Sequence, residues 1–308
     1  MKKILLSISL ALLISFSLFV SFQYIFQKEM TTNETQFFSR TFDDSDKILL
    51  IGSSHVGMLD SEEIEKIINE NHSEEFEIYN LAKGSDTPTK RLKHFSQIHS
   101  LKPILVVYGL GFRDFAGITP INNEYPLPNP ENFIKNSFYF EADFLQNPKL
   151  TTLNVIRNIV GVTPSHATSM TSTPFFPYSE RHSNIMYLED IGIFYKNNAE
   201  VTKIPEPENN LQLQSLIFLL NQFENNNIDV ILFITPHNSE YLETLNDVDK
   251  KNFENIIEFI ENKYDIHVNS LLTNYTKSEI WSSPNHIVHG PKGFIFNQDI
   301  AKMIIEET

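Results

Sequence analysis

The stretch KILLIGSSHVG, residues 47–57, is where the fold of this chain first becomes readable. Four apolar residues, Ile48 to Ile51, run into Gly52, and two serines and a histidine follow. A short apolar run that ends at a glycine is typical of a buried parallel strand. Ser54 would follow the carboxyl end of that strand, either as a nucleophile or as an ordinary polar residue of a turn.

The same alternation of short apolar runs and helical patterns continues along the chain. Further runs typical of strands are FEIYNLA (76–82), PILVVYGLG (103–111), IDVILFITPHN (228–238) and YDIHVNSLL (264–272). Patterns typical of amphipathic helices lie between them and after the last, at 59–71, 89–100, 211–225, 253–260 and 293–307. Parallel strands need crossover helices, so this order predicts a three-layer α/β/α sandwich around a mostly parallel, five-stranded, flavodoxin-like sheet.

The N-terminus predicts a membrane segment. Lys2 and Lys3 precede an uncharged run over residues 4–27. At about 1.5 Å per residue, a helix of this length crosses a hydrocarbon core of roughly 30 Å. We expect a signal anchor at residues 1–28 rather than a cleaved signal peptide, because the run is long and ends without a clear small-residue cleavage site. The two lysines would stay in the cytoplasm and the rest of the chain would lie on the extracytoplasmic side.

The remaining chain divides at changes in composition. A polar linker is expected at 29–45, followed by a single domain at 46–308. The strand–helix rhythm stops at about residue 115 and returns at about 207, which predicts an insertion with some structure of its own.

Composition limits the classes of function. The chain has 308 residues, of which 41% are hydrophobic and 20% charged, as in globular proteins. Its net charge of −15 argues against nucleic-acid partners, because such a surface repels phosphate groups. The chain has no cysteine, which excludes disulfides and thiolate catalysis.

Residues suited to acyl transfer follow the predicted strands, at the edge where parallel sheets form their sites. Acyl transfer needs a hydroxyl nucleophile, a base within about 3 Å of it and donors for the developing oxyanion. The candidates, in chain order, are Ser54, Gly84, the group Gly111, Arg113 and Asp114, then His237, and finally His286 and His289.

The order of these segments resembles the SGNH, or GDSL-like, hydrolase family. IGSSH resembles its Gly-Asp-Ser turn, and SSPNHIVHG its Asp-x-x-His segment; the resemblance implies Ser54 as nucleophile and His286 as base, with His289 as the alternate base. YNLAKGSD and YGLGFRDF resemble its second and third blocks, which implies an oxyanion hole made by the Ser54 and Gly84 amides with Arg113. The resemblance covers residues 47–114 and 228–308 and implies an SGNH-type fold.

Three positions depart from the family pattern. Ser53 stands where the family has aspartate, and Arg113 stands where it has the oxyanion-hole asparagine. Ser283 stands three residues before His286, where the acid belongs, and a serine cannot stabilise an imidazolium as a carboxylate does. The site would then be a Ser–His dyad, would borrow a carboxylate such as Asp114, or would be inactive.

The other histidines have more than one interpretation. His55 and His237, with Gly111, are expected to line the pocket, although His55 is also typical of a packing residue. HIVH places two imidazoles three residues apart, but the chain has no cysteine and no nearby carboxylate cluster, so we expect neither a metal nor a cofactor.

The sequence thus leads to two hypotheses. The first is an extracytoplasmic, membrane-anchored esterase or O-acyltransferase acting on acylated surface glycans or lipid-linked glycans. It follows from a further resemblance: with its expected anchor, this SGNH-like chain also resembles cell-wall D-alanine transfer proteins and polysaccharide O-acetyltransferases. The second is a catalytically degraded SGNH-like domain that binds a surface glycan or a partner protein.

Overall fold

A computed structural model describes residues 37–38, 42, 45–73, 75–117, 184–197 and 203–307. The chain divides into two compact units, Met1–Arg40 with Pro128–Ser169, and Thr41–Leu127 with Met170–Thr308. All strands and helices discussed below belong to the second unit. Within the described residues, no helix is both long and apolar enough to cross a membrane, and the anchor expected at 1–28 lies outside them.

The second unit is built on a five-stranded sheet in which every pair of neighbouring strands is parallel. Its strands are β1 (Asp46–Gly52), β2 (Phe76–Asn80), β3 (Leu105–Leu110), β4 (Asp229–Ile234) and β5 (Val268–Ser270), in the order β2-β1-β3-β4-β5. The α/β class and the parallel five-stranded sheet predicted from the sequence are confirmed. The order is one of the two common doubly wound orders, with a switch point between β1 and β3.

The central strands are buried on both faces, as their continuous apolar runs predict. Every residue of β3 is buried, and only Asp46 of β1 is exposed. Ile48 pairs with Leu105 and Leu50 with Val107, and Leu105 in turn pairs with Asp229. β1 and β3 therefore occupy the middle of the sheet, where their carboxyl ends are held firmly.

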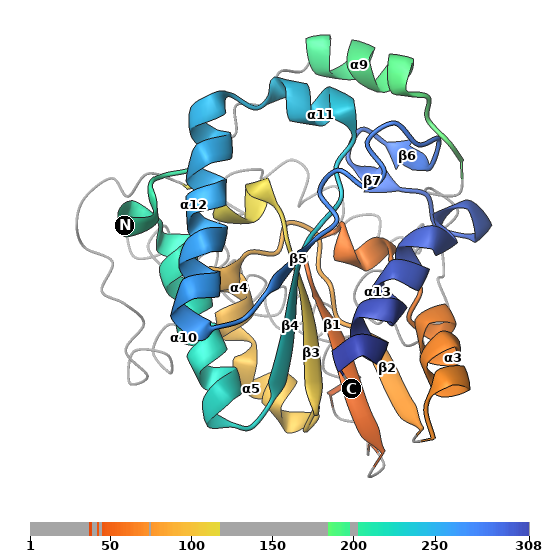
Figure 1. The fold of residues 1–308 in the computed structure, drawn as a ribbon, viewed down its shortest axis with the longest axis vertical. Helices are drawn as coiled ribbons and strands as arrows, with labels where there is room; N and C mark the ends of the chain where they lie inside the picture. Colours follow the sequence, from red (N-terminus) through yellow and green to blue (C-terminus); the bar gives the residue numbers. More distant parts are fainter. Residues whose placement is uncertain are drawn as a thin grey trace, which may run out of the picture. The chain divides into compact units, whose positions relative to one another are not determined.

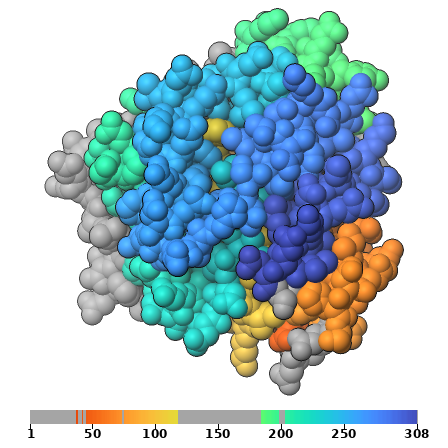
Figure 2. All heavy atoms as spheres, in the orientation of Figure 1, coloured from red at the N-terminus to blue at the C-terminus, as the bar shows by residue number. Residues whose placement is uncertain are grey.

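Helices cover both faces of the sheet (Figure 1). α3 (Ser61–Asn71) and α13 (Phe294–Glu307) pack together on one face. α4 (Pro88–Lys93), α5 (Phe95–Ser100), α10 (Leu211–Asn225) and α12 (Asp247–Tyr264) lie on the other. In the space-filling view, α12, α13 and the segment that joins them hide most of the sheet (Figure 2).

Most predicted helices form where their patterns place them. The Asp60 side chain caps α3 by accepting hydrogen bonds from the amides of Glu62 and Glu63. The single helix predicted at 89–100 is two helices, because the chain leaves helical geometry at His94. At this break the His94 ring hydrogen bonds the Gln97 side chain, in the first turn of α5, at 2.9 Å.

Four short elements lie beyond the carboxyl edge of the sheet (Figure 1). They are α9 (Leu188–Asn197), α11 (Ser239–Thr244), and the antiparallel strands β6 (Trp281–Ser283) and β7 (His286–Ile287). Short 3-10 turns occur at Val56–Met58, Phe112–Phe115, Pro207–Asn209 and Pro291–Gly293. α9 falls within the insertion expected at about 115–207, whose boundaries stay a prediction.

Candidate active site

The turn after β1 is tight, and Gly52 makes it possible. Gly52 has φ +143°, a conformation that other residues rarely adopt. A Cβ at this position would lie 2.7 Å from the Gly109 carbonyl oxygen and 2.5 Å from a Val56 methyl. The Gly57 amide donates to the Ser53 carbonyl at 3.2 Å and closes the turn. Ser54 is therefore presented, half-buried, at the carboxyl end of a central strand.

Ser54 lies within hydrogen-bond distance of His286. The Ser54 Oγ and His286 Nε2 atoms are 2.8 Å apart, although the two residues are separated by 232 positions in the sequence. The other ring nitrogen, Nδ1 of His286, is 2.8 Å from Ser283 Oγ. These contacts form a continuous chain, Ser54–His286–Ser283, with the geometry of a nucleophile, a base and an orienting group.

Proton positions follow from the roles of these atoms. The Ser54 hydroxyl can donate to Nε2 only if His286 carries its proton on Nδ1, and that N–H then donates to Ser283 Oγ. This is the tautomer in which Nε2 can remove a proton from Ser54. Ser283 Oγ is then a neutral acceptor for the imidazole, at a position where the family pattern predicts a carboxylate and the sequence alone gives a serine no role.

The structure gives Asp114 other partners than the one proposed for it. Its Oδ2 atom accepts a hydrogen bond from the Gly111 amide at 2.7 Å, and its carboxyl also hydrogen bonds the Ser53 side chain. Burial raises the pKa of this carboxyl to about 8, so it is mostly neutral at pH 7. Asp114 is thus bonded to the Gly111 amide and to Ser53 and is mostly neutral at pH 7, and its role as the acid for His286 stays a prediction.

His55 and His237 lie beside the hydrogen-bonded residues Ser54, His286 and Ser283 as buried, neutral rings. The ring centroid of His55 is 4.9 Å from that of His237 and 5.5 Å from that of His286. Burial lowers the pKa of His237 to about 3 and that of His55 well below its ordinary value, and neighbouring charges add to both shifts. His237 also borders Gly111, where a Cβ would come within 3.6 Å of its Nε2 atom. Gly111, His55 and His237 therefore lie close together and His55 lies beside His286, whereas their role in lining a pocket stays a prediction.

The segment that carries Gly84 is fastened to the β1 turn. The Lys83 amide donates to the Gly52 carbonyl at 3.1 Å, so Gly84 follows directly on a contact with the turn that presents Ser54. Asn80 strengthens this connection through its side chain, which donates to the carbonyls of Val56 and Leu59 at 3.0 and 2.9 Å.

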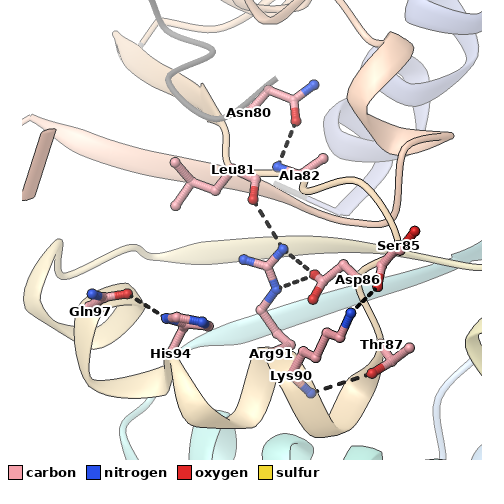
Figure 3. Close-up of polar contacts among 10 residues, drawn as sticks. All are labelled: Asn80, Leu81, Ala82, Ser85, Asp86, Thr87, Lys90, Arg91, His94 and Gln97. Carbon is pink, nitrogen blue, oxygen red and sulfur yellow. Dashed lines mark hydrogen bonds and ion pairs between the residues drawn. The ribbon is translucent and has the colours of Figure 1, made fainter. Parts of the chain in front are cut away.

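A buried ion pair holds the far side of the same segment (Figure 3). Arg91 donates from Nε to Asp86 Oδ2 at 2.7 Å and from Nη2 to the same oxygen and, at 3.0 Å, to the Leu81 carbonyl. Both side chains are almost fully buried, so loss of either partner would leave an uncompensated charge. The segment that carries Gly84 is therefore held by a buried ion pair rather than by a contact on the surface.

Arg113 and His289 lie at the same edge of the sheet. Arg113 is exposed in the turn after β3, and its positive charge lowers the pKa of both His55 and His237. His289 follows β7, and the imidazole that accepts the Ser54 hydrogen bond is that of His286. The geometry thus favours His286 over His289 as the base. In the part of the chain that the structure describes, no three histidine or acidic side chains are arranged to hold a metal ion.

Comparisons with known proteins give no further guide to this arrangement. The chain matches no protein-family model and no curated protein.

Proposed function

We propose that the chain is a serine esterase or O-acyltransferase of the SGNH type, anchored to a membrane with its domain on the extracytoplasmic side. The observation that carries this proposal is the hydrogen-bonded chain Ser54–His286–Ser283, with both contacts at 2.8 Å. The strand order and the position of Ser54 after β1 support the SGNH-type fold. The anchor rests on the uncharged run at 4–27.

The reaction follows from the roles of these atoms. Ser54 Oγ attacks the carbonyl carbon of an acyl ester while its proton passes to His286 Nε2. The amides of Ser54 and Gly84, with Arg113, hold the oxyanion of the tetrahedral intermediate. As the intermediate collapses, the alcohol leaves with the proton from His286, and the acyl group stays on Ser54.

The acyl-enzyme then reacts a second time. His286 removes a proton from water or from a sugar hydroxyl, whose oxygen attacks the acyl carbonyl; the intermediate then collapses, and Ser54 leaves with the proton returned from His286. The proposed substrates are acylated surface glycans or lipid-linked glycans, which an anchored domain on the outer face of a membrane can reach. No cofactor takes part in either half-reaction.

A second candidate is a binding domain without catalysis, and Ser283 is the observation that favours it. A serine hydroxyl can orient His286 but supplies no negative charge to stabilise the imidazolium. Such a domain would bind a surface glycan or a partner protein at the site around Ser54.

A fluorophosphonate probe separates the two candidates. The full-length protein, in detergent, should be labelled, and labelling should be lost in Ser54→Ala and kept in Ser53→Ala. Ser53 is the matched control because it is the adjacent serine and hydrogen bonds Asp114 and His55 instead. A folded wild-type protein that stays unlabelled between pH 6 and 9 would favour the binding domain.

The membrane anchor has its own test. The protein should stay with the membrane after washing with alkaline carbonate and should keep residues 1–28, as read by N-terminal sequencing. A soluble protein that begins after residue 28 would show that the segment is a cleaved signal.

A further inference from the structure

The turn that carries His286 needs support from outside itself. Ser283 ends β6 and His286 begins β7, so only Pro284 and Asn285 separate the two residues that must be aligned. β6 and β7 form a separate two-stranded sheet that is not part of the five-stranded one. An isolated pair of such short strands is marginal in water, so its position depends on what contacts it.

Two side chains from different elements meet at the Pro284 carbonyl oxygen. Asn238 donates to it from Nδ2 at 2.6 Å, and Tyr195 donates to it from its hydroxyl at 2.9 Å. A carbonyl oxygen has two lone pairs, and here both have a donor. Pro284 lies directly after Ser283, so these bonds act on the backbone between the two partners of the imidazole.

Asn238 is anchored to the main sheet. It follows β4, is fully buried, and its Oδ1 atom caps α11 by accepting from the Tyr241 amide at 2.8 Å. Its side chain therefore makes one hydrogen bond to α11 and one to the Pro284 carbonyl, and so connects both to the segment that follows β4.

Tyr195 is anchored by the packing of α9. The Met186 amide, just before α9, donates to the Trp281 carbonyl of β6 at 2.7 Å. Gly192 lies against the Glu240 side chain of α11, where a Cβ would meet the carboxylate at 2.5 Å, and the Tyr195 ring is 5.8 Å from that of Tyr241. Figure 1 shows α9 beside α11 and next to β6 and β7. Burial raises the pKa of the Tyr195 hydroxyl, which stays a donor at neutral pH.

We propose that Tyr195 and Asn238 are positioning residues, which keep His286 aligned with Ser54 by jointly holding the Pro284 carbonyl. This inference rests on the proposed function, because it assigns these residues to the step in which His286 takes the Ser54 proton. Proton transfer requires the base within about 3 Å of the hydroxyl, so a small shift of the turn slows it without removing any reacting group.

The test compares Tyr195→Phe with Tyr187→Phe in the full-length protein. Tyr195→Phe removes a hydroxyl from α9, and Tyr187→Phe removes one from the residue just before α9. Tyr187 is the control because its side chain is 61% exposed. With p-nitrophenyl acetate as substrate, Tyr195→Phe should lower kcat roughly 3- to 10-fold, the effect of one lost hydrogen bond, with KM changed by less than about two-fold. Tyr187→Phe should match the wild type.

Asn238→Asp tests the second donor. The carboxylate can still accept from the Tyr241 amide, so the cap of α11 is kept while the donor to Pro284 is lost. This variant should also lower kcat more than it raises KM. The double variant His286→Ala/Tyr195→Phe distinguishes positioning from a general effect on folding. If Tyr195 acts through His286, adding Tyr195→Phe to His286→Ala should cause no further loss of residual activity.

Each outcome decides a different claim. If the wild type is active and labelled at Ser54 but Tyr195→Phe and Asn238→Asp keep its kcat, the positioning role is wrong and the proposed function stands. An equal loss in the His286→Ala background also overturns the positioning role. If the folded wild type neither hydrolyses the ester nor reacts with the fluorophosphonate, both proposals fall.

Discussion

Two adjacent serines at the end of β1 begin two hydrogen-bonded chains that differ in almost every respect. Ser54 is half-buried and contacts His286, which contacts Ser283. Ser53 is buried and contacts His55 at 3.3 Å and the carboxyl of Asp114. We call the first the reactive chain and the second the buried chain.

The two chains differ in which of them contains the carboxyl group of Asp114. The carboxyl lies in the buried chain, where desolvation keeps it mostly neutral at pH 7 and the Gly111 amide donates to it. The reactive chain has only hydroxyl and imidazole groups. The buried chain therefore supports the turn after β3, whereas the reactive chain has the atoms that proton transfer from Ser54 requires.

The largest expected effect comes from removing the base of the reactive chain. His286→Ala should slow fluorophosphonate labelling about 10³-fold, because Ser54 then has no acceptor for its proton. His289→Ala should change the rate by less than about two-fold. The measurement is the second-order labelling rate at pH 7.5, with folding checked by circular dichroism. The reverse result for the two histidines would make His289 the base and would break the assignment of the reactive chain.

Much of this arrangement could be predicted from the sequence, for a physical reason. The apolar runs and helical periods are local patterns, and parallel strands bring their carboxyl ends to one edge. The position of Ser54 at that edge therefore follows without knowledge of any contact, whereas the choice of His286 as the base rests on the family resemblance. The segment 89–100 is an exception, because its helical period continues through His94, where the chain leaves helical geometry and the ring hydrogen bonds Gln97.

The remaining details depend on side-chain direction and on distant contacts. Asp114 and Arg113 are neighbours in one turn, yet one is buried and the other exposed, and no periodic pattern distinguishes them. Tyr195 and Asn238 are 89 and 46 positions from Pro284, and no pattern in the sequence connects either residue to it. The spacing to His286 identifies Ser283 as the residue at the acid position, but a neutral hydroxyl does not by itself indicate a role.

The next effect, on stability, tests the buried chain. The pKa of Asp114 is raised from 3.8 to about 8, so the folded state holds a proton that the unfolded state has lost over this range. Its contribution to stability is fully present below pH 3.8 and is lost as the pH rises towards 8. Asn at this position does not titrate and can still accept from the Gly111 amide.

The window from pH 6.5 to 8 isolates this effect. Below 6.5 the lowered pKa of His237 gives the opposite slope, because its stabilising contribution is lost as the pH falls towards 3. Between pH 6.5 and 8 the wild type should lose about 2 kcal/mol of unfolding free energy relative to Asp114→Asn. Urea unfolding of both proteins at several pH values measures it. Parallel curves would mean that Asp114 is ionised, which would erase the contrast in charge between the two chains.

The smallest effect concerns the neutral end of the reactive chain. Ser283→Ala removes the acceptor for Nδ1–H of His286, so the ring loses the bond that selects its tautomer, and kcat for an ester should fall about 10-fold. Ser283→Asp keeps an acceptor at the same position and adds a negative charge, which stabilises the imidazolium formed when Ser54 attacks. This variant should exceed the wild type several-fold in kcat, with KM little changed, as measured with p-nitrophenyl acetate. A wild-type rate in Ser283→Ala would show that Ser54 and His286 act as a dyad. Loss of activity in Ser283→Asp, with the fold intact, would show instead that the site requires a neutral partner, and the separation of the carboxyl from the reactive chain would then be a functional requirement.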